Sequence, residues 1–134
     1  MERRGRLKVL LDSHVLIWAL ADDPALGAKA REALADPEVE KLVSAASAME
    51  ITRKHRKGRL PQADALAGDF HGVLRQLDCS TLAITFEHAL VAGTMDIPHK
   101  DPFDRLLIAQ ARCEDVPIVS NEKLFDGFGV LRIW

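Results

Sequence analysis

The sequence predicts an α/β fold: a single α/β/α sandwich domain over residues 1–134, in which helices cover both faces of a central parallel five-stranded sheet. Short apolar segments alternate with segments of helical period along the whole chain. The apolar segments lack the polar alternation of a half-exposed strand, which is typical of parallel strands buried on both faces. A length of 134 residues suits one domain with its own core.

The first half of the chain contains the first two predicted strands and three predicted helices. In the order strand, helix, helix, strand, helix, they cover residues 7–11, 15–21, 23–35, 41–44 and 47–57. Asp23 followed by Pro24 is typical of a helix start, and Gly58 is typical of the position just after a helix.

The second half supplies the remaining three strands. In the order helix, strand, helix, helix, strand, strand, the predicted elements cover residues 64–77, 81–84, 86–93, 102–115, 117–120 and 130–133. The longest of the helices begins at Asp101 and Pro102, because Asp accepts hydrogen bonds at an N-cap and Pro suits the first helical position.

Composition excludes several classes of protein. With 48% hydrophobic residues, 28% charged residues, a net charge of −2 and a pI near 6.2, the chain is neither disordered nor a broadly basic nucleic-acid-coating protein. Arg3, Arg4 and Arg6 imitate the start of a signal peptide, but Asp12 and His14 interrupt the apolar stretch that follows, so we expect a cytoplasmic protein without a membrane anchor. The two isolated cysteines are expected to be buried, reduced thiols.

Acidic residues occur at the junctions between strands and helices. Asp12 ends the first strand, Glu50 follows the second, and Glu122 follows the fourth, while Asp104 lies in the first turn of the long helix. Ligands of an open parallel sheet bind beyond the carboxyl ends of its strands. These acids are therefore expected to face a common cleft.

A cluster of carboxylates suits a hard divalent cation. Mg²⁺ and Mn²⁺ prefer oxygen ligands, and they relieve a repulsion of roughly 4 kcal/mol between two carboxylates about 4 Å apart. Such an ion activates water and stabilises charge on a phosphoryl group. A structural alternative stays open for two acids, because Glu50 could close a capping box with Ser47 and Asp104 could simply complement the helix dipole.

Basic residues near the acids are candidates for contact with nucleic-acid phosphate. Arg53, Lys54 and Lys57 lie near the end of one predicted helix, where they could equally complement its dipole or be solvated. Arg105 follows Asp104 and could orient a phosphate or pair with Asp101.

The motifs together resemble the PIN domains, and most closely the VapC-like ribonuclease toxins of bacterial toxin–antitoxin pairs. The resemblance runs over nearly the whole chain, through LLDSHVLIW at 10–18, VSAASAMEI at 43–51, GRLP at 58–61, HKDPFDRLLIAQA at 99–111 and VSNE at 119–122.

This resemblance implies a ribonuclease that uses Mg²⁺ or Mn²⁺. Asp12, Glu50 and Asp104 match the family's metal-binding acids, and Glu122 stands where a fourth acid is commonly Asp, which puts its direct metal contact in doubt. The resemblance also implies a homodimer bound by a cognate antitoxin. The helix over 15–21 is apolar nearly all round, so one side of it faces either another subunit or the core.

Two other functional classes stay open. A non-catalytic PIN-like module that binds RNA or protein would keep the fold without metal chemistry. A receiver domain or a haloacid-dehalogenase-like phosphatase also has acids at strand ends, but each requires a second acid beside the first strand, and the residues after Asp12 are Ser13 and His14.

Overall fold

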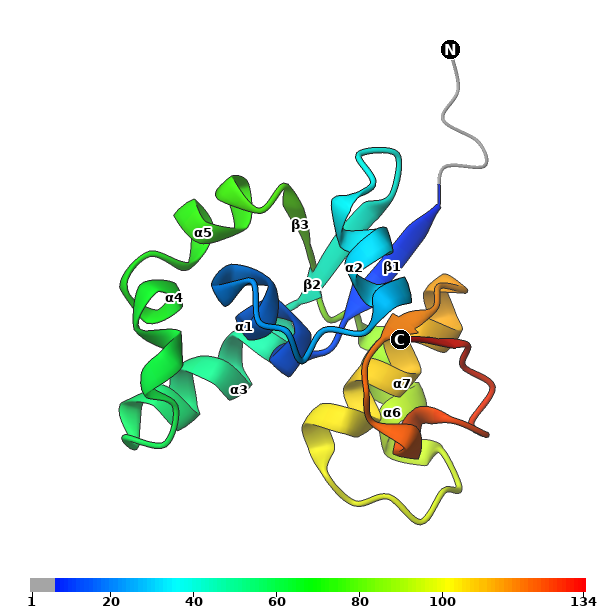
Figure 1. Ribbon diagram of the computed structural model, residues 1–134. Coiled ribbons are helices and arrows are strands. Elements are labelled where there is room, and N and C mark those ends of the chain that lie inside the picture. Colours follow the sequence, from blue (N-terminus) through cyan, green and yellow to red (C-terminus); the bar gives the residue numbers. More distant parts are fainter. Residues whose placement is uncertain (1–6) are drawn as a thin grey trace.

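The computed structural model describes residues 7–134 and has a sheet of five parallel strands at its centre (Figure 1). The strands are β1 (Lys8–Leu11), β2 (Glu40–Ser44), β3 (Cys79–Leu82), β4 (Ile118–Val119) and β5 (Arg132–Ile133). Their order is β3-β2-β1-β4-β5, and each neighbouring pair is parallel. The predicted α/β/α fold is confirmed. Arg3, Arg4 and Arg6 lie outside the described residues.

Seven α-helices connect and cover the strands within residues 7–134. They are α1 (Ser13–Ala21), α2 (Ala28–Ala35), α3 (Ala45–Arg56), α4 (Asp64–Gly68), α5 (Phe70–Gln76), α6 (Phe86–Thr94) and α7 (Pro102–Glu114). Two short 3₁₀ helices, η1 (Pro61–Ala63) and η2 (Lys123–Phe125), complete the described elements. Among the residues described, no helix combines the length and the apolar character that a membrane crossing requires.

Strand β1 shows how the sheet is buried on both faces. Val9 and Leu11 belong to a core shared with α1, α2, α3 and α5, whereas Leu10 belongs to a second core shared with α7. Successive side chains of a strand point to opposite faces, so an unbroken apolar strand requires cover on both sides. Figure 1 shows α6 and α7 together on the side opposite α2.

The apolar character of α1 is explained by the core. Val15, Leu16 and Ile17 are buried, and Trp18 and Leu20 pack against the same cluster. The core therefore accounts for this helix, and its composition gives no support to a subunit contact.

Two helices differ from their predicted extent because aspartates make local turns. The predicted start at Asp23 and Pro24 is wrong: the Asp23 side chain accepts a hydrogen bond from the Ala25 N–H at 2.8 Å, which holds a turn there, and α2 begins only at Ala28. The predicted helix over 64–77 is broken at Asp69, whose backbone is not helical and whose side chain caps α5 through the Gly72 N–H at 3.0 Å.

Two further predictions fail at exposed positions. Strand β3 lies two residues earlier than expected, because it is an edge strand whose exposed Ser80 and Thr81 carry no apolar signal. Cys113 is exposed rather than buried, since it lies on the solvent side of α7, and Cys79 is half-buried. Both thiols are free.

Helix α3 begins earlier than predicted, and this matters for Glu50. Ser44, the last residue of β2, is the N-cap, and its hydroxyl accepts a hydrogen bond from the Ala46 N–H at 2.9 Å. The capping box between Ser47 and Glu50 is therefore not formed. The Glu50 carboxylate is left free to make tertiary contacts.

Candidate functional site

Asp12 is fixed at the carboxyl end of β1. It caps α1, with its Oδ1 accepting a hydrogen bond from the Ser13 N–H at 2.7 Å. Its Oδ2 accepts a hydrogen bond from the hydroxyl of Ser120 at 2.8 Å. Ser120 directly follows β4, the strand that pairs with β1, so the two neighbouring strand ends are tied together at the site.

Burial makes the Asp12 carboxylate costly to ionise. The residue is only 6% exposed. Burial raises its pKa from 3.8 to about 6, although the hydrogen bonds from Ser120 and Ser13 act in the opposite direction. A carboxylate has about four lone-pair sites, and here it accepts two hydrogen bonds from protein groups. Such a group is well suited to a bound cation.

Asp104 faces the site from the first turn of α7. The predicted helix start is confirmed: Asp101 is the N-cap, accepting from the N–H groups of Phe103 and Asp104 at 2.9 and 3.1 Å, and Pro102 follows it. The Asp104 Oδ2 accepts a hydrogen bond from the His99 Nε2 at 2.7 Å. Burial raises the pKa of Asp104, and the contact with His99 lowers it.

Glu50 reaches the site from the middle of α3, with both of its carboxylate oxygens engaged. The Ser13 hydroxyl donates to its Oε1 at 2.7 Å, and the Lys54 ammonium lies 2.9 Å from its Oε2. The Ser13 hydroxyl also lies 2.9 Å from that of Ser47. These contacts join α1 to α3 directly beside Asp12.

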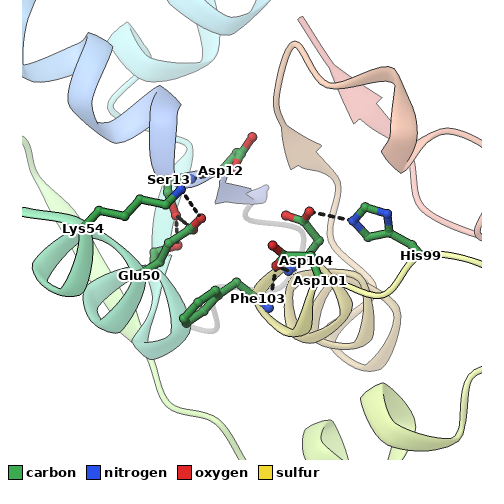
Figure 2. A network of polar contacts seen from close by, with 9 residues as sticks. Asp12, Ser13, Glu50, Lys54, His99, Asp101, Phe103 and Asp104 are labelled. Carbon is green, nitrogen blue, oxygen red and sulfur yellow. Dashed lines mark hydrogen bonds and ion pairs between the residues drawn. The ribbon is translucent and has the colours of Figure 1, made fainter. Parts of the chain in front are cut away.

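Figure 2 shows the three acids on three elements that surround one space, with α3 on one side and α7 on the other. Their charges interact, because Asp104 contributes to the raised pKa of Asp12, and Glu50 contributes to that of Asp104. Among the described residues, no three acids, histidines or cysteines are close enough to form a complete metal-binding group. Mg²⁺ commonly uses only one or two carboxylates with several waters, so these oxygen donors fit such an ion.

Glu122 is placed differently from the other acids. Its backbone N–H donates to the Ser120 hydroxyl at 2.9 Å, which puts the residue one contact away from Asp12. Its side chain is exposed, and within the described chain no hydrogen bond to its carboxylate is found. The structure thus brings Asp12, Glu50 and Asp104 around one space and leaves Glu122 at its margin.

The Arg105 guanidinium is engaged with backbone carbonyls and not with the acids of the site. Its guanidinium donates to the carbonyl oxygens of Ala92, Met95 and His99 at 2.8, 2.7 and 2.8 Å, and to that of Ile97 at 3.4 Å. The pairing with Asp101 that the sequence allowed is not formed. Arg105 anchors the loop between α6 and α7, so binding RNA phosphate would require it to give up these contacts.

The three basic residues predicted on α3 have different surroundings. The Arg53 guanidinium lies 5.8 Å from the centre of the Phe103 ring, a cation–π contact between α3 and α7. Lys54 is paired with Glu50, and Lys57 is exposed at the end of the helix. Lys57 is thus the freest of the three to meet a phosphate, and RNA binding by all three stays a prediction.

Sequence reasoning missed the serines that hold the acids. Ser13 and Ser120 are buried, at 4% and 0% exposed, and donate to Glu50 and Asp12. A signal was available, since a serine next to an acid or at the end of an apolar strand needs a hydrogen-bond partner when it is buried.

Comparison with solved structures finds several of the same fold. A DNA-bound VapBC from Salmonella typhimurium matches with a TM-score of 0.68 at 18% identity, covering 94% of this chain and 96% of that one. VapBC2 from Rickettsia felis, bound to a promoter DNA fragment, matches with a TM-score of 0.66 at 13% identity over 94% and 97% of the two chains. A toxin–antitoxin complex from Klebsiella pneumoniae matches with a TM-score of 0.58 at 16% identity over 92% and 95%.

No curated protein matches the sequence. The strand order also differs from the 2-1-3-4-5 order of receiver domains, which removes that alternative. The sequence model of the PIN domain matches residues 9–130. The chain therefore belongs to the PIN domain family.

Proposed function

We propose that this PIN domain is a metal-dependent endoribonuclease and the toxin of a toxin–antitoxin pair, acting in the cytoplasm. The observation that carries the proposal is the buried Asp12 carboxylate at the carboxyl end of β1, with a pKa raised to about 6, facing Asp104 across the site. A buried acid with few partners beside a second acid is expected where a cation binds.

The chain's own residues would hold the ion and position the RNA. Asp12 and Asp104 would bind Mg²⁺ or Mn²⁺, with Asp12 fixed by Ser13 and Ser120. When bound, the ion would neutralise charge on the phosphoryl group and lower the pKa of the attacking water. Glu50, predicted as a third ligand, would act directly or through water, and Arg53 and Lys57 would contact the RNA backbone.

The decisive experiment is an RNA cleavage assay with purified protein in Mg²⁺ or Mn²⁺. We expect cleavage that EDTA abolishes and that Asp12→Asn lowers by at least about a hundredfold, since it removes a charged ligand. Asp115→Asn is a matched control, because Asp115 is exposed at the far end of α7 in a left-handed conformation that Asn tolerates. Cleavage that survives both EDTA and Asp12→Asn would contradict the metal mechanism.

The toxin assignment is supported by the resemblance of the motifs to VapC-like toxins and by the fold shared with the Klebsiella pneumoniae complex. A toxin should arrest growth when expressed alone. Co-expression of the product of a short neighbouring reading frame should restore growth and yield a copurifying antitoxin. Unrestricted growth at high expression, together with no Mn²⁺ binding, would favour the non-catalytic PIN-like module instead.

A homodimer also belongs to this proposal, and α6 offers its best surface. Phe86 and Leu90 lie four residues apart on α6 and are 82% and 53% exposed, and Ile84, just before the helix, is exposed too. Exposed apolar side chains grouped on one element mark an interaction surface. Light scattering should show a dimer in the wild type and a monomer for Phe86→Glu, while Leu131→Glu, at another exposed apolar residue, should leave the dimer intact.

A further inference from the structure

We propose that the Lys54 ammonium takes the place of a second metal ion at the acidic site. It neutralises Glu50, so the site binds one divalent cation, through Asp12 and Asp104, rather than two. This inference rests on the proposed metal-dependent function and specifies how many ions that function uses.

The first observation is that Glu50 already has a cationic partner. Lys54 lies 2.9 Å from Oε2, and the Ser13 hydroxyl donates to Oε1 at 2.7 Å. The Glu50 side chain is only 13% exposed, so water screens this ion pair less than it screens a pair on the surface. A metal ion that bound Glu50 directly would have to share the carboxylate with the Lys54 ammonium, and the two positive charges would repel each other.

The second observation is that the fold holds the pair in place. Glu50 and Lys54 are four residues apart on α3, in the favourable order with the acid on the N-terminal side. Ser13 is fixed in turn, because it lies in the first turn of α1 and its hydroxyl contacts that of Ser47 on α3. The fold therefore holds the Lys54 ammonium next to Glu50 before any ligand binds.

The third observation is that Glu50 has a cationic partner, whereas Asp12 and Asp104 do not form an ion pair with a lysine or arginine of the described residues. Lys54 balances the charge of Glu50. Within the described residues, the side-chain partner of Asp104 is the His99 imidazole, and the donors to Asp12 are the Ser13 N–H and the Ser120 hydroxyl. Two carboxylates are thus left without a lysine or arginine partner, and a single divalent cation can balance them.

The ammonium also has donors to spare. A lysine ammonium carries three N–H groups, and one of those of Lys54 is directed at Glu50. The remaining donors are available to an RNA phosphate oxygen. In a two-metal nuclease the second ion also stabilises charge on the phosphate, so Lys54 would replace it in that role as well. Lys54 thus acts as a fixed positive charge at the site.

The number of bound ions tests the proposal directly, by calorimetric titration with Mn²⁺ at pH 7.5. We expect one Mn²⁺ per chain for the wild type and two for Lys54→Met, which leaves three uncompensated acids. Lys54→Arg keeps the charge and should bind one. Lys57→Met is the matched control, because Lys57 is an exposed lysine three residues further along, and it too should bind one.

A charge cycle on affinity gives an independent answer, including the case in which Lys54→Met does not fold. Glu50→Gln leaves the ammonium unpaired beside the ion and should weaken Mn²⁺ binding by about tenfold or more. The double variant Glu50→Gln with Lys54→Met restores the original charge and should recover the dissociation constant to within about threefold. If Glu50 binds the ion directly, the double variant will stay as weak as Glu50→Gln.

The outcomes separate this inference from the proposed function. If the wild type binds no Mn²⁺, the metal-dependent function fails and the inference fails with it. If the wild type binds two ions, if Lys54→Met still binds one, or if the double variant stays weak, the role assigned to Lys54 is overturned while the nuclease proposal stands.

Discussion

Asp12 and His88 are both buried ionisable side chains, but their surroundings differ. Asp12 lies at the carboxyl edge of the sheet and is 6% exposed; His88 lies between α6 and α7 and is 1% exposed. Asp12 would be ionised at neutral pH in water, yet burial works against its charge. His88 lies in a site in which both of its ring nitrogens have partners.

The contacts of His88 require the neutral ring. The backbone N–H of Thr85 donates to its Nδ1 at 3.0 Å, so Nδ1 carries no proton, and Nε2 lies 2.9 Å from the Glu114 carboxylate, to which it donates. The Thr85 hydroxyl accepts the His88 N–H in return, completing a capping box at the start of α6. His88 therefore links the start of α6 to the end of α7.

This contrast distinguishes a structural site, at His88, from a functional one, at Asp12. The polar atoms of the His88 ring are satisfied, and such a network stabilises the fold without needing a ligand. Asp12 keeps a charge that its surroundings disfavour, at a place where Asp104 adds repulsion. A protein that retains such an unfavourable charge has a use for it. The effects of substitution at the two sites should therefore have opposite signs.

The largest effect is expected at His88. His88→Ala removes a buried ring and leaves the Thr85 N–H and Glu114 without their partner, so the free energy of unfolding should fall by about 3–4 kcal/mol. Urea unfolding measures this change. His71→Ala, at an exposed histidine, is the control and should change stability by less than about 0.5 kcal/mol. A small loss at His88 would mean that the two buried sites do not differ as described.

The opposite sign is expected at Asp12 when metal is removed with EDTA. A pKa raised from 3.8 to about 6 corresponds to a cost of about 3 kcal/mol for keeping the ionised group in the folded state. Asp12→Asn removes the charge, so the free energy of unfolding at pH 7.5 should rise by up to about 3 kcal/mol. The same substitution should abolish RNA cleavage. The Asp12 charge would then lower the stability of the fold and be required for activity.

The pH dependence identifies the cause of that gain. Because the pKa of Asp12 is raised on folding, its proton stabilises the folded state at low pH, and this contribution is lost as the pH rises through about 6. The gap between Asp12→Asn and the wild type should be about 3 kcal/mol at pH 7.5 and about half that at pH 5. A gap that is constant with pH would indicate improved packing instead of the removal of a charge.

The sequence was sufficient to predict where the acids lie but not what holds them. Asp12 and Asp104 could be placed from local patterns, because the end of a strand and an Asp-Pro helix start are each indicated by a few neighbouring residues. The parallel sheet then follows from the alternation of elements, and it brings the strand ends to one edge. These parts of the site depend on short-range signals and a simple topological rule.

Long-range partners could not be predicted in the same way. The Ser120 hydroxyl meets Asp12 only because β4 pairs with β1, and Ser13 meets Glu50 only because α1 packs beside α3. Local competition also misled the sequence reading, since Ser44 instead of Ser47 caps α3. Spacing alone does not distinguish such alternatives, because each satisfies the same local hydrogen-bonding rule.

A smaller effect is expected at Arg105, which tests whether the loop before Asp104 is part of the functional region. Arg105→Lys keeps the charge but cannot reach the three carbonyls of Ala92, Met95 and His99 at once, so we expect a loss of about 1–2 kcal/mol in urea unfolding. Arg112→Lys, exposed on the same helix, should be nearly neutral. If the two variants are equally stable, the carbonyl contacts contribute little, and Arg105 becomes available for phosphate.

The smallest effect is expected at Glu122, which tests the boundary between the functional site and the ordinary surface. Its side chain is exposed, so Glu122→Gln should change the metal-free stability by less than about 0.5 kcal/mol at either pH 5 or pH 7.5. Its contact with Ser120 is made by the backbone N–H and survives the substitution. A gain at pH 7.5 like that of Asp12→Asn would mean that Glu122 shares the repulsion at the site, and the unfavourable charge would then extend to the end of β4.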